Sequence, residues 1–222
     1  MGHMSGEAAG AATGYHAAHL TADPARTVLW SVLARHLARW IPPDAHVVEL
    51  GAGYCDWINH VQAARRTAVD IWPDISQHAA PGVETMVLDL SRDLTALGRS
   101  TFDTVLASNL LEHFEPDTAS RLVGGIAEVL RPGGRVVLVQ PNFRFAFRHY
   151  FDDYTHRSIF TDVSLAALLR AHRLDIELVQ PRFLPYSIRG ARGFVHPWLV
   201  RAYLHAPVKP LAGQMLVVAR KP

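Results

Sequence analysis

The amino-acid sequence predicts an α/β fold with a mainly parallel, doubly wound sheet. Short apolar runs typical of buried strands alternate with helix-like stretches along most of the 222 residues. One of these runs, His46–Leu50, leads directly into a turn that contains Gly51 and Gly53. Open α/β sheets bind nucleotides at such turns, because the chain bends sharply at the carboxyl end of the strand and glycines let a ligand approach the backbone.

The individual elements follow from local signals. The first predicted helix, Thr27–Trp40, is amphipathic and ends before Pro42-Pro43, because proline cannot continue a helix. A helix-compatible stretch, Trp57–Arg65, follows the glycine turn, and a Pro132-Gly133-Gly134 turn precedes a later strand. We expect further strands at Thr67–Ile71, Thr85–Leu88, Phe102–Ser108, Arg135–Gln140, Asp175–Val179 and Gln214–Ala219, and further helices at Asp117–Leu130, Asp162–His172 and near Trp198–His205.

The composition indicates one well-packed domain. A hydrophobic fraction of 49% and a mean hydropathy of +0.07 suit an α/β protein of this length. No apolar run approaches the roughly 20 residues of a membrane span, the first residues do not resemble a signal peptide, and one cysteine, Cys55, excludes an internal disulfide. We therefore expect a cytoplasmic protein with a disordered tail over 1–14, which starts with a cloning remnant, and a single domain over 15–222. Segments 141–160 and 183–212 interrupt the alternation and are predicted to cover a substrate.

Charge is unevenly distributed along the chain. Residues 1–130 hold 8 basic and 15 acidic residues, hence −7, whereas residues 131–222 hold 14 basic and 5 acidic ones, hence +9. This asymmetry suits an anionic substrate, an anionic membrane surface or simply a solvated arginine-rich face. The sequence shows no nucleic-acid-binding module, and its 13 histidines form no metal-binding pattern with an acid or a cysteine pair, so neither a nucleic acid nor a metal is expected.

The residues at the predicted strand ends favour one class of nucleotide. A dinucleotide fingerprint would place a third glycine at position 56, where this chain has Asp56. Glu49 lies two residues before the first glycine and could face the ammonium group of an amino-acid ligand, which NAD lacks and S-adenosylmethionine carries. Asp70 ends a strand, and its carboxylate could accept both ribose hydroxyls. Asp89, with the Leu90 amide, could bind adenine, although Asp89 could also be an ordinary turn acid.

With these motifs, the chain resembles the class I S-adenosylmethionine-dependent methyltransferases over most of residues 15–220. The resemblance implies a Rossmann-like fold with a C-terminal antiparallel strand pair, and S-adenosyl-L-methionine as cofactor with S-adenosyl-L-homocysteine as product. Shorter motifs, among them Gln140-Pro141-Asn142, look like a bacterial subgroup often associated with glycan or secondary metabolism. Where the family usually has a third glycine, this chain has Cys55. The motifs are Glu49-Leu50-Gly51-Ala52-Gly53, Asp70, Asp89-Leu90, Ser108-Asn109-Leu110-Leu111-Glu112-His113 and Leu130-Arg131-Pro132-Gly133-Gly134.

The resemblance also assigns roles to individual residues. His113 borders the methyl group in this family, so it could deprotonate an acceptor or only shape the pocket. In the segment after the fifth strand, an Asp153/His156 pair is available for base catalysis, although the same residues could simply close a lid. The predicted cofactor residues are Glu49, Gly51, Ala52, Gly53, Asp70, Ile71, Asp89, Leu90, Ser108 and Asn109; the predicted substrate residues are Asn142, Arg148, Tyr150, Asp153, Tyr154 and Arg157.

These observations predict methyl transfer to a small molecule, which is expected to be aromatic or anionic. O-methylation is favoured, and N- or C-methylation stays open. A catalytically silent S-adenosylmethionine-binding protein is the alternative, whereas Asp56 and the lack of a Tyr-x-x-x-Lys pair disfavour an NAD(P)-dependent oxidoreductase. The segment Trp198–His205 could touch a membrane, seal a lipid-like acceptor or pack between subunits, of which packing is favoured. The oligomeric state does not follow from the sequence.

Overall fold

A computed structural model describes residues 23–92, 94–187 and 195–222. The predicted tail, 1–14, and part of the second predicted cover, 188–194, lie outside these residues. Seven strands form one sheet in the order β3-β2-β1-β4-β5-β7-β6, and only β7 runs antiparallel to its neighbours. The strands are β1 (His46–Leu50), β2 (Arg65–Asp70), β3 (Val83–Val87), β4 (Phe102–Ser108), β5 (Leu130–Pro141), β6 (Asp175–Pro185) and β7 (Ala212–Arg220).

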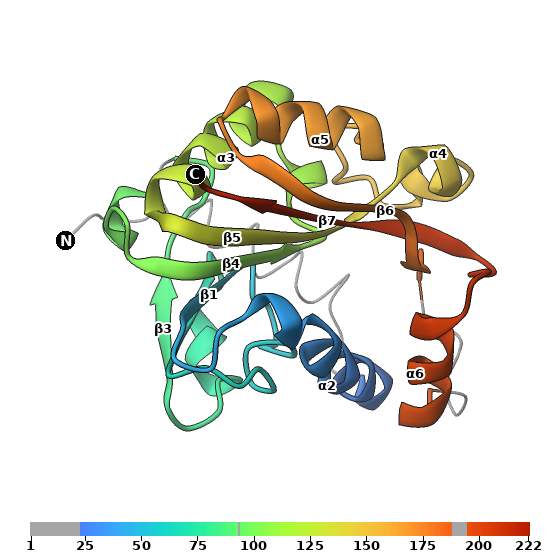
Figure 1. Cartoon of the computed structure of the whole chain (residues 1–222), viewed down its shortest axis with the longest axis horizontal. Coiled ribbons are helices and arrows are strands. Elements are labelled where there is room, and N and C mark those ends of the chain that lie inside the picture. The colour runs from blue at the N-terminus through green and yellow to red at the C-terminus, as the bar shows by residue number, and fades with distance from the viewer. Residues whose placement is uncertain (1–22, 93, 188–194) are drawn as a thin grey trace.

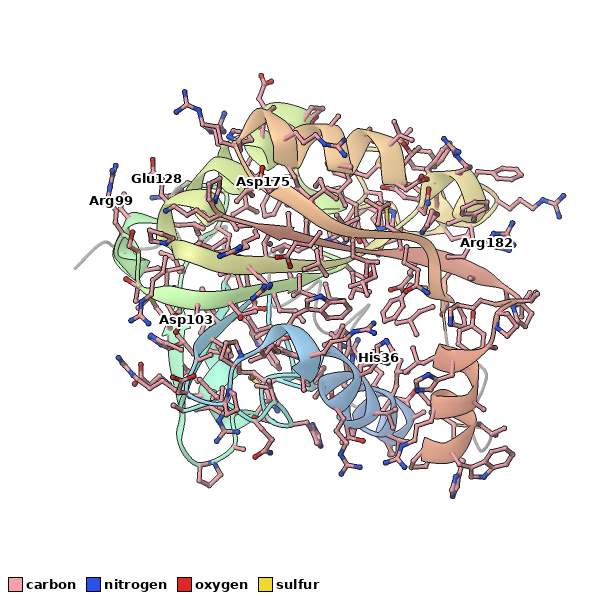
Figure 2. The ribbon with its side chains drawn as sticks, viewed as in Figure 1. His36, Arg99, Asp103, Glu128, Asp175 and Arg182 are labelled. Atoms are coloured by element: carbon pink, nitrogen blue, oxygen red, sulfur yellow. The ribbon has the colours of Figure 1, made fainter. Side chains whose placement is uncertain are left out.

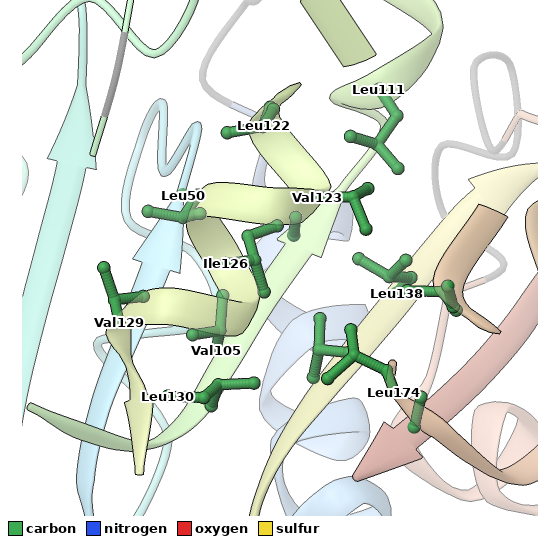
Figure 3. Close-up of a cluster of buried hydrophobic side chains, with 14 of the residues drawn as sticks. Leu50, Val105, Leu111, Leu122, Val123, Ile126, Val129, Leu130, Leu138 and Leu174 are labelled. Carbon is green, nitrogen blue, oxygen red and sulfur yellow. The ribbon is translucent and has the colours of Figure 1, made fainter. Parts of the chain in front are cut away.

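Helices cover both faces of the sheet, with α3 and α5 on one face and α2 and α6 on the other (Figure 1). Apolar side chains fill both layers, as they must when a parallel sheet is buried on both sides. The cluster under α3 includes Leu50, Ile126 and Leu138 (Figure 3), and the opposite cluster includes Leu33, Ile58 and Val218. The helices are α2 (Pro24–Leu37), α3 (Pro116–Val129), α4 (Phe143–Ala146), α5 (Asp162–Ala171) and α6 (Pro197–His205).

The expected helix over Trp57–Arg65 is wrong. Residues 53–60 make successive turns instead, and Arg65 already belongs to β2. Side chains tie this segment to distant parts of the chain, and one of them takes an amide that a regular helix would use. The Ile58 amide donates to Glu49 Oε2 (3.0 Å), and the Asn59 side chain is bonded across to His78 O and Ala80 N, both at 2.8 Å.

The predicted turn at residues 132–134 is a bulge within β5. Phe102 pairs with Leu130 and Thr104 pairs with Arg135, so the four residues between Leu130 and Arg135 loop out of the ladder. Gly133 has φ = 79° there, and its amide donates to Lys221 O at 2.9 Å. The strand therefore begins five residues earlier than expected.

Helix α6 packs within the protein through Val200 and Leu204, which belong to the same buried cluster as α2. The imidazole rings of His205 on α6 and His36 on α2 lie 5.8 Å apart. Lys209 closes the end of α6, because its Nζ donates to the carbonyls of Tyr203 (2.8 Å) and Leu204 (2.7 Å). Among the described residues, no helix has the length and apolar character needed to cross a membrane.

Candidate active site

The glycine turn lies where the strand order reverses, since β1 is flanked by β2 on one side and β4 on the other. Ligands of open α/β sheets bind at this switch point, outside the carboxyl ends of the strands. Gly51 (φ = 70°) and Gly53 (φ = 50°) adopt left-handed conformations. The amides of Gly51 and Ala52 both donate to Val69 O, at 2.8 and 3.1 Å, which ties the turn to the end of β2.

Asp70 joins the end of β2 to the glycine turn. Its Oδ2 accepts from the Gly53 amide (2.8 Å) and its Oδ1 from the Trp72 amide (2.9 Å), and its side chain is buried. A carboxylate oxygen can accept more than one hydrogen bond, and the predicted contact of Asp70 with ribose hydroxyls stays a prediction. Ile71, between Asp70 and Trp72, is half-buried.

Glu49 lies beneath the turn. It is buried, its Oε2 accepts from the Ile58 amide, and burial raises the pKa of its carboxyl well above the usual range. The side chain therefore holds the segment after the glycine turn in place. Its predicted contact with an ammonium group stays a prediction.

The residues after β4 complete the switch point. Asn109 is exposed in a left-handed conformation (φ = 47°), and its Nδ2 donates to Ser108 Oγ at 3.2 Å. Leu110 packs on the glycine turn so closely that a Cβ atom on Gly51 would lie 2.9 Å from Leu110 Cδ1. The segments after β1 and β4 thus form one surface.

Asp89 forms a tight local turn after β3. Its Oδ1 accepts from the Ser91 amide (3.0 Å) and hydroxyl (2.6 Å), and its Oδ2 pairs with Arg92 Nε at 3.3 Å. This geometry is that of the turn acid considered above as the alternative to an adenine contact. Leu90 is buried in the core cluster.

Cys55 occupies the position of the family's third glycine in a left-handed conformation, with φ = 58°. Its thiol is fully buried, and burial raises its pKa to about 12, with the Glu49, Asp70 and Asp56 carboxylates adding to the shift. A thiol in this state is a small packing group and a poor nucleophile.

The two predicted catalytic histidines meet, although 43 positions separate them. The rings of His113 and His156 lie 5.0 Å apart, and Glu112 joins them, so that one ligand atom from each of the three residues lies within 4.8 Å of the others. Backbone bonds fix this arrangement, because Glu112 O accepts from the amides of Arg157 (2.7 Å) and Ser158 (3.1 Å). We call Glu112, His113 and His156 the acid–histidine cluster.

Thr155 links this cluster to Asp153. Its hydroxyl donates to Asp153 Oδ1 (2.5 Å) and lies 2.9 Å from His113 Nδ1. Because a threonine hydroxyl has only one hydrogen, His113 must donate through Nδ1, so in the neutral ring Nε2 carries the lone pair. The sequence predicted an Asp153/His156 pair. In the structure, Asp153 Oδ1 accepts from the amide and hydroxyl of Thr155, and this hydroxyl links Asp153 to His113.

Burial dominates the electrostatics of the cluster. Glu112 is 1% exposed, and burial raises its pKa to about 8, with the Asp153 carboxylate adding to the shift and its own backbone amide opposing it. Burial lowers the pKa of His156, while Asp153 and the Tyr150 carbonyl act in the opposite direction. The motif containing Glu112 was recognised in the sequence, but no role was assigned to it, because its closeness to His156 arises only from the fold.

The predicted substrate residues differ in exposure. Asn142 is buried and caps α4, with its amide donating to Asp162 Oδ1 (2.9 Å) and Pro181 O (3.1 Å). Tyr150 is buried as well, its hydroxyl donates to Ser158 O (2.5 Å), and its ring packs 4.5 Å from that of His156. Three residues lie at the surface, namely Arg148, Tyr154 and Arg157.

Comparison with known proteins identifies the family. A family model described as a methyltransferase domain matches residues 23–179. Because this match covers well over half of the chain, the chain belongs to the methyltransferase domain family and is an S-adenosylmethionine-dependent methyltransferase of class I, as the sequence predicts. The seven-stranded sheet with its antiparallel end confirms the predicted fold.

Solved structures share this fold at low sequence identity. A Haloferax volcanii methyltransferase complex with the activator Trm112 contains a chain with 17% identity and a TM-score of 0.66, and the match covers 96% of this chain and 94% of that one. NodS, an N-methyltransferase from Bradyrhizobium japonicum solved with S-adenosylhomocysteine, has 14% identity, coverages of 97% and 98%, and a TM-score of 0.63. The Burkholderia thailandensis 1,6-didemethyltoxoflavin-N1-methyltransferase has 23% identity, coverages of 97% and 87%, and a TM-score of 0.59. No curated protein sequence matches the chain.

The residues at the switch point fit S-adenosylmethionine. The ligand has a diol, an adenine and an amino-acid end, so it needs a carboxylate, backbone groups and small polar side chains. Asp70 places a carboxylate at the glycine turn, and Ser108 and Asn109 place polar groups across the strand reversal.

Proposed function

We propose that this enzyme methylates a hydroxyl oxygen of a small molecule that binds against the acid–histidine cluster. The observation that carries the proposal is the cluster itself, two of whose residues, Glu112 and His113, follow shortly after Leu110, which packs on the glycine turn. It gathers two imidazoles and a carboxylate, groups that accept a hydrogen bond from a hydroxyl. The cluster therefore suits an acceptor that must lose a proton, such as a hydroxyl, better than an acceptor that is already ionised.

S-adenosylmethionine supplies an activated methyl group, so the protein mainly has to bind, align and exclude water. Asp70 and the glycine turn would hold the nucleoside, and Ser108 with Asn109 the amino-acid end. The cluster would orient the acceptor hydroxyl and promote the loss of its proton. Thr155 and Asp153 would be positioning residues, because their hydrogen-bond chain fixes the orientation of the His113 ring.

The segment 141–160 is proposed to cover the acceptor. Its aromatic rings pack on one another, with the Phe143 and Tyr150 centroids 5.2 Å apart and those of Tyr150 and Phe151 5.3 Å apart. The Tyr150 ring reaches His156, which makes an aromatic wall beside the cluster. Arg148 and Arg157 are exposed on the same segment and could bind an anionic group.

Nitrogen is the second candidate acceptor atom. The names of two of the structural relatives describe N-methyltransferases, so amines belong in any substrate panel. Release of S-adenosylhomocysteine would be measured with phenols, aliphatic alcohols, carboxylic acids and amines, and mass spectrometry would locate the added methyl group. Methylation confined to amines would contradict the O-methylation proposal. No turnover despite normal cofactor affinity would favour the catalytically silent alternative.

The cofactor site is tested by calorimetric titration with S-adenosylhomocysteine, beside NAD. Asp70→Asn should weaken binding about 10- to 100-fold, because a hydrogen bond to a charged group contributes roughly 1.5–3 kcal/mol. Asp74→Asn is the matched control, since Asp74 is exposed four residues further on. Equal affinity of Asp70→Asn and the unchanged protein would rule out the assigned nucleoside site.

A further inference from the structure

The acid–histidine cluster has a second property, which is an unpaired buried carboxylate. Neither oxygen of Glu112 is hydrogen-bonded to another residue in the described part of the chain, and the side chain is 1% exposed. Leaving such a group unpaired is costly, and buried carboxylates are normally paired or bound to a metal. A bound cation would provide the partner that the Glu112 carboxylate lacks.

Each histidine contributes one ring nitrogen to the acid–histidine cluster. His156 Nδ1 is buried and has no hydrogen-bond partner within the described residues. His113 is held through Nδ1 by Thr155, which in turn is held by Asp153, so Nε2 is its lone-pair nitrogen. A histidine that ligates a metal almost always donates its other ring N–H to a fixed oxygen, which is the arrangement seen for His113.

The spacing of these atoms allows them to share one ion. One ligand atom from each residue lies within 4.8 Å of the others. In a tetrahedral zinc site with bonds of roughly 2.0–2.1 Å, ligand atoms lie about 3.4 Å apart. Small rotations of the side chains would close the difference between these two separations. The ring contacts of His156 with His113 (5.0 Å) and Tyr150 (4.5 Å) limit that rotation to small adjustments.

We propose that Glu112, His113 and His156 bind one divalent transition-metal ion of the Zn²⁺ type and leave an open coordination position. Two imidazole nitrogens and one carboxylate oxygen are one of the donor sets of catalytic zinc sites, whereas Mg²⁺ and Ca²⁺ prefer oxygen ligands. The expectation from the sequence, that no metal is bound, rested on local spacing. It could not include a site whose ligands come from the segments after β4 and β5.

The role of the ion rests on the proposed function. An acceptor hydroxyl would occupy the open position, where the positive charge lowers its pKa so that its proton passes to bulk water. The oxygen then forms a bond to the methyl carbon with its own electron pair. The carbon–sulfur bond breaks with its electrons remaining on sulfur, which yields S-adenosylhomocysteine. Metal binding itself does not depend on this step.

The test is a titration of the metal-stripped full-length protein with Co²⁺, followed by visible absorption, with Zn²⁺ as competitor. We expect one equivalent of Co²⁺ with the bands of a tetrahedral site, displaced by Zn²⁺. Glu112→Gln should weaken binding at least about 100-fold, since it removes a ligand, and Thr155→Val about 10- to 100-fold, since it releases His113. His149→Gln is the matched control, because His149 pairs with Asp152 at 3.0 Å on the same segment but is exposed.

Three results would overturn the proposal: no bound Co²⁺ in the unchanged protein, equal affinity in Glu112→Gln, or loss of binding only in His149→Gln. Thermal melting without metal checks that each variant folds. If Glu112→Gln does not fold, Thr155→Val provides a second test of the metal site. Titration with S-adenosylhomocysteine after chelation separates the two proposals. Retained cofactor binding without any metal binding would contradict only the metal site, whereas metal binding without cofactor binding would contradict only the proposed function.

Discussion

At the scale of single residues, Gly51 meets two separate requirements. Its φ of 70° lies in the left-handed region, and Leu110 occupies the space where a side chain would begin. Gly51→Ala should therefore lose about 1–2 kcal/mol from backbone strain alone, and more from the contact with Leu110. The free energy of unfolding in urea and the affinity for S-adenosylhomocysteine would both be measured, and both should fall.

Gly82 provides the control for this experiment. It also has a positive φ, of 82°, but a Cβ atom there would meet only Arg66 at 3.5 Å, an ordinary contact. Gly82→Ala should show the backbone cost without the clash. Adding Leu110→Ala to Gly51→Ala should restore part of the cofactor affinity, and no restoration would mean that Leu110 does not set the shape of the turn.

His36 makes stability sensitive to acid. Burial lowers its pKa to about 4, and the charges of Arg39, His205 and Lys209 act in the same direction. The ring lies on α2 on the side towards α6 (Figure 2) and 5.9 Å from the Phe183 ring. Because the unfolded chain takes up this proton near pH 6.5 and the folded protein only near pH 4, stability is lost as the pH falls between these values.

His36→Gln should therefore flatten the decrease in unfolding free energy between pH 6.5 and pH 4. We expect an effect of about 1–2 kcal/mol, because solvent screens the half-exposed ring. The measurement is urea unfolding at several pH values, with exposed His149→Gln for comparison. If the unfolding free energy of His36→Gln falls as steeply with pH as that of the unchanged protein, His36 is not the residue responsible.

At the scale of elements, α6 depends on a residue beyond its own end. Lys209 Nζ donates to the carbonyls of Tyr203 and Leu204 in the last helical turn, where carbonyls lack the donors of a following turn. Tyr203 O also accepts from the Ala206 amide at the end of the helix. Lys209→Met keeps much of the side-chain length but removes both bonds, so it should destabilise α6 by about 1–3 kcal/mol. Faster amide hydrogen exchange confined to α6 and its contact with α2 would confirm this, with Arg201→Met, an exposed position on α6, as control.

Strands could be predicted from the sequence more reliably than the segment after the glycine turn. Buried strands such as β1 and β4 each contain a short apolar run of valine, leucine or alanine, so their positions follow from the sequence pattern. The segment 57–65 also looks helical, but residues 53–60 make successive turns, and Glu49 takes the Ile58 amide that a regular helix would use. Such competition depends on tertiary contacts that local spacing does not contain.

For the same reason, part of the candidate site could be predicted from the sequence and part could not. The glycine turn and Asp70 form a sequence pattern within one strand–turn–strand unit, so they could be located directly. Glu112 became a candidate only when the fold brought it next to His156. Burial also raises the pKa of the Glu112 carboxyl, and burial at this position does not follow from the motif.

At the scale of the whole molecule, the sheet separates two cores. Ile126 lies in one and Ile58 in the other, and both are fully buried. Ile126→Val and Ile58→Val should each reduce the free energy of unfolding by about 0.5–1.5 kcal/mol. Together their effects should add within about 0.5 kcal/mol. Urea unfolding of both single variants and the double variant measures this, and a larger deviation would show that strain passes through the sheet.

The position of β7 has a consequence for the timing of folding. This strand is the last of the seven in the chain, but it lies between β5 and β6 and pairs with both. During translation, β5 and β6 leave the ribosome with their facing edges unpaired, and unpaired edges can recruit strands from other chains. The nascent protein therefore stays vulnerable to aggregation until residues 212–220 have emerged. A pause in synthesis just before this strand would prolong that vulnerable state.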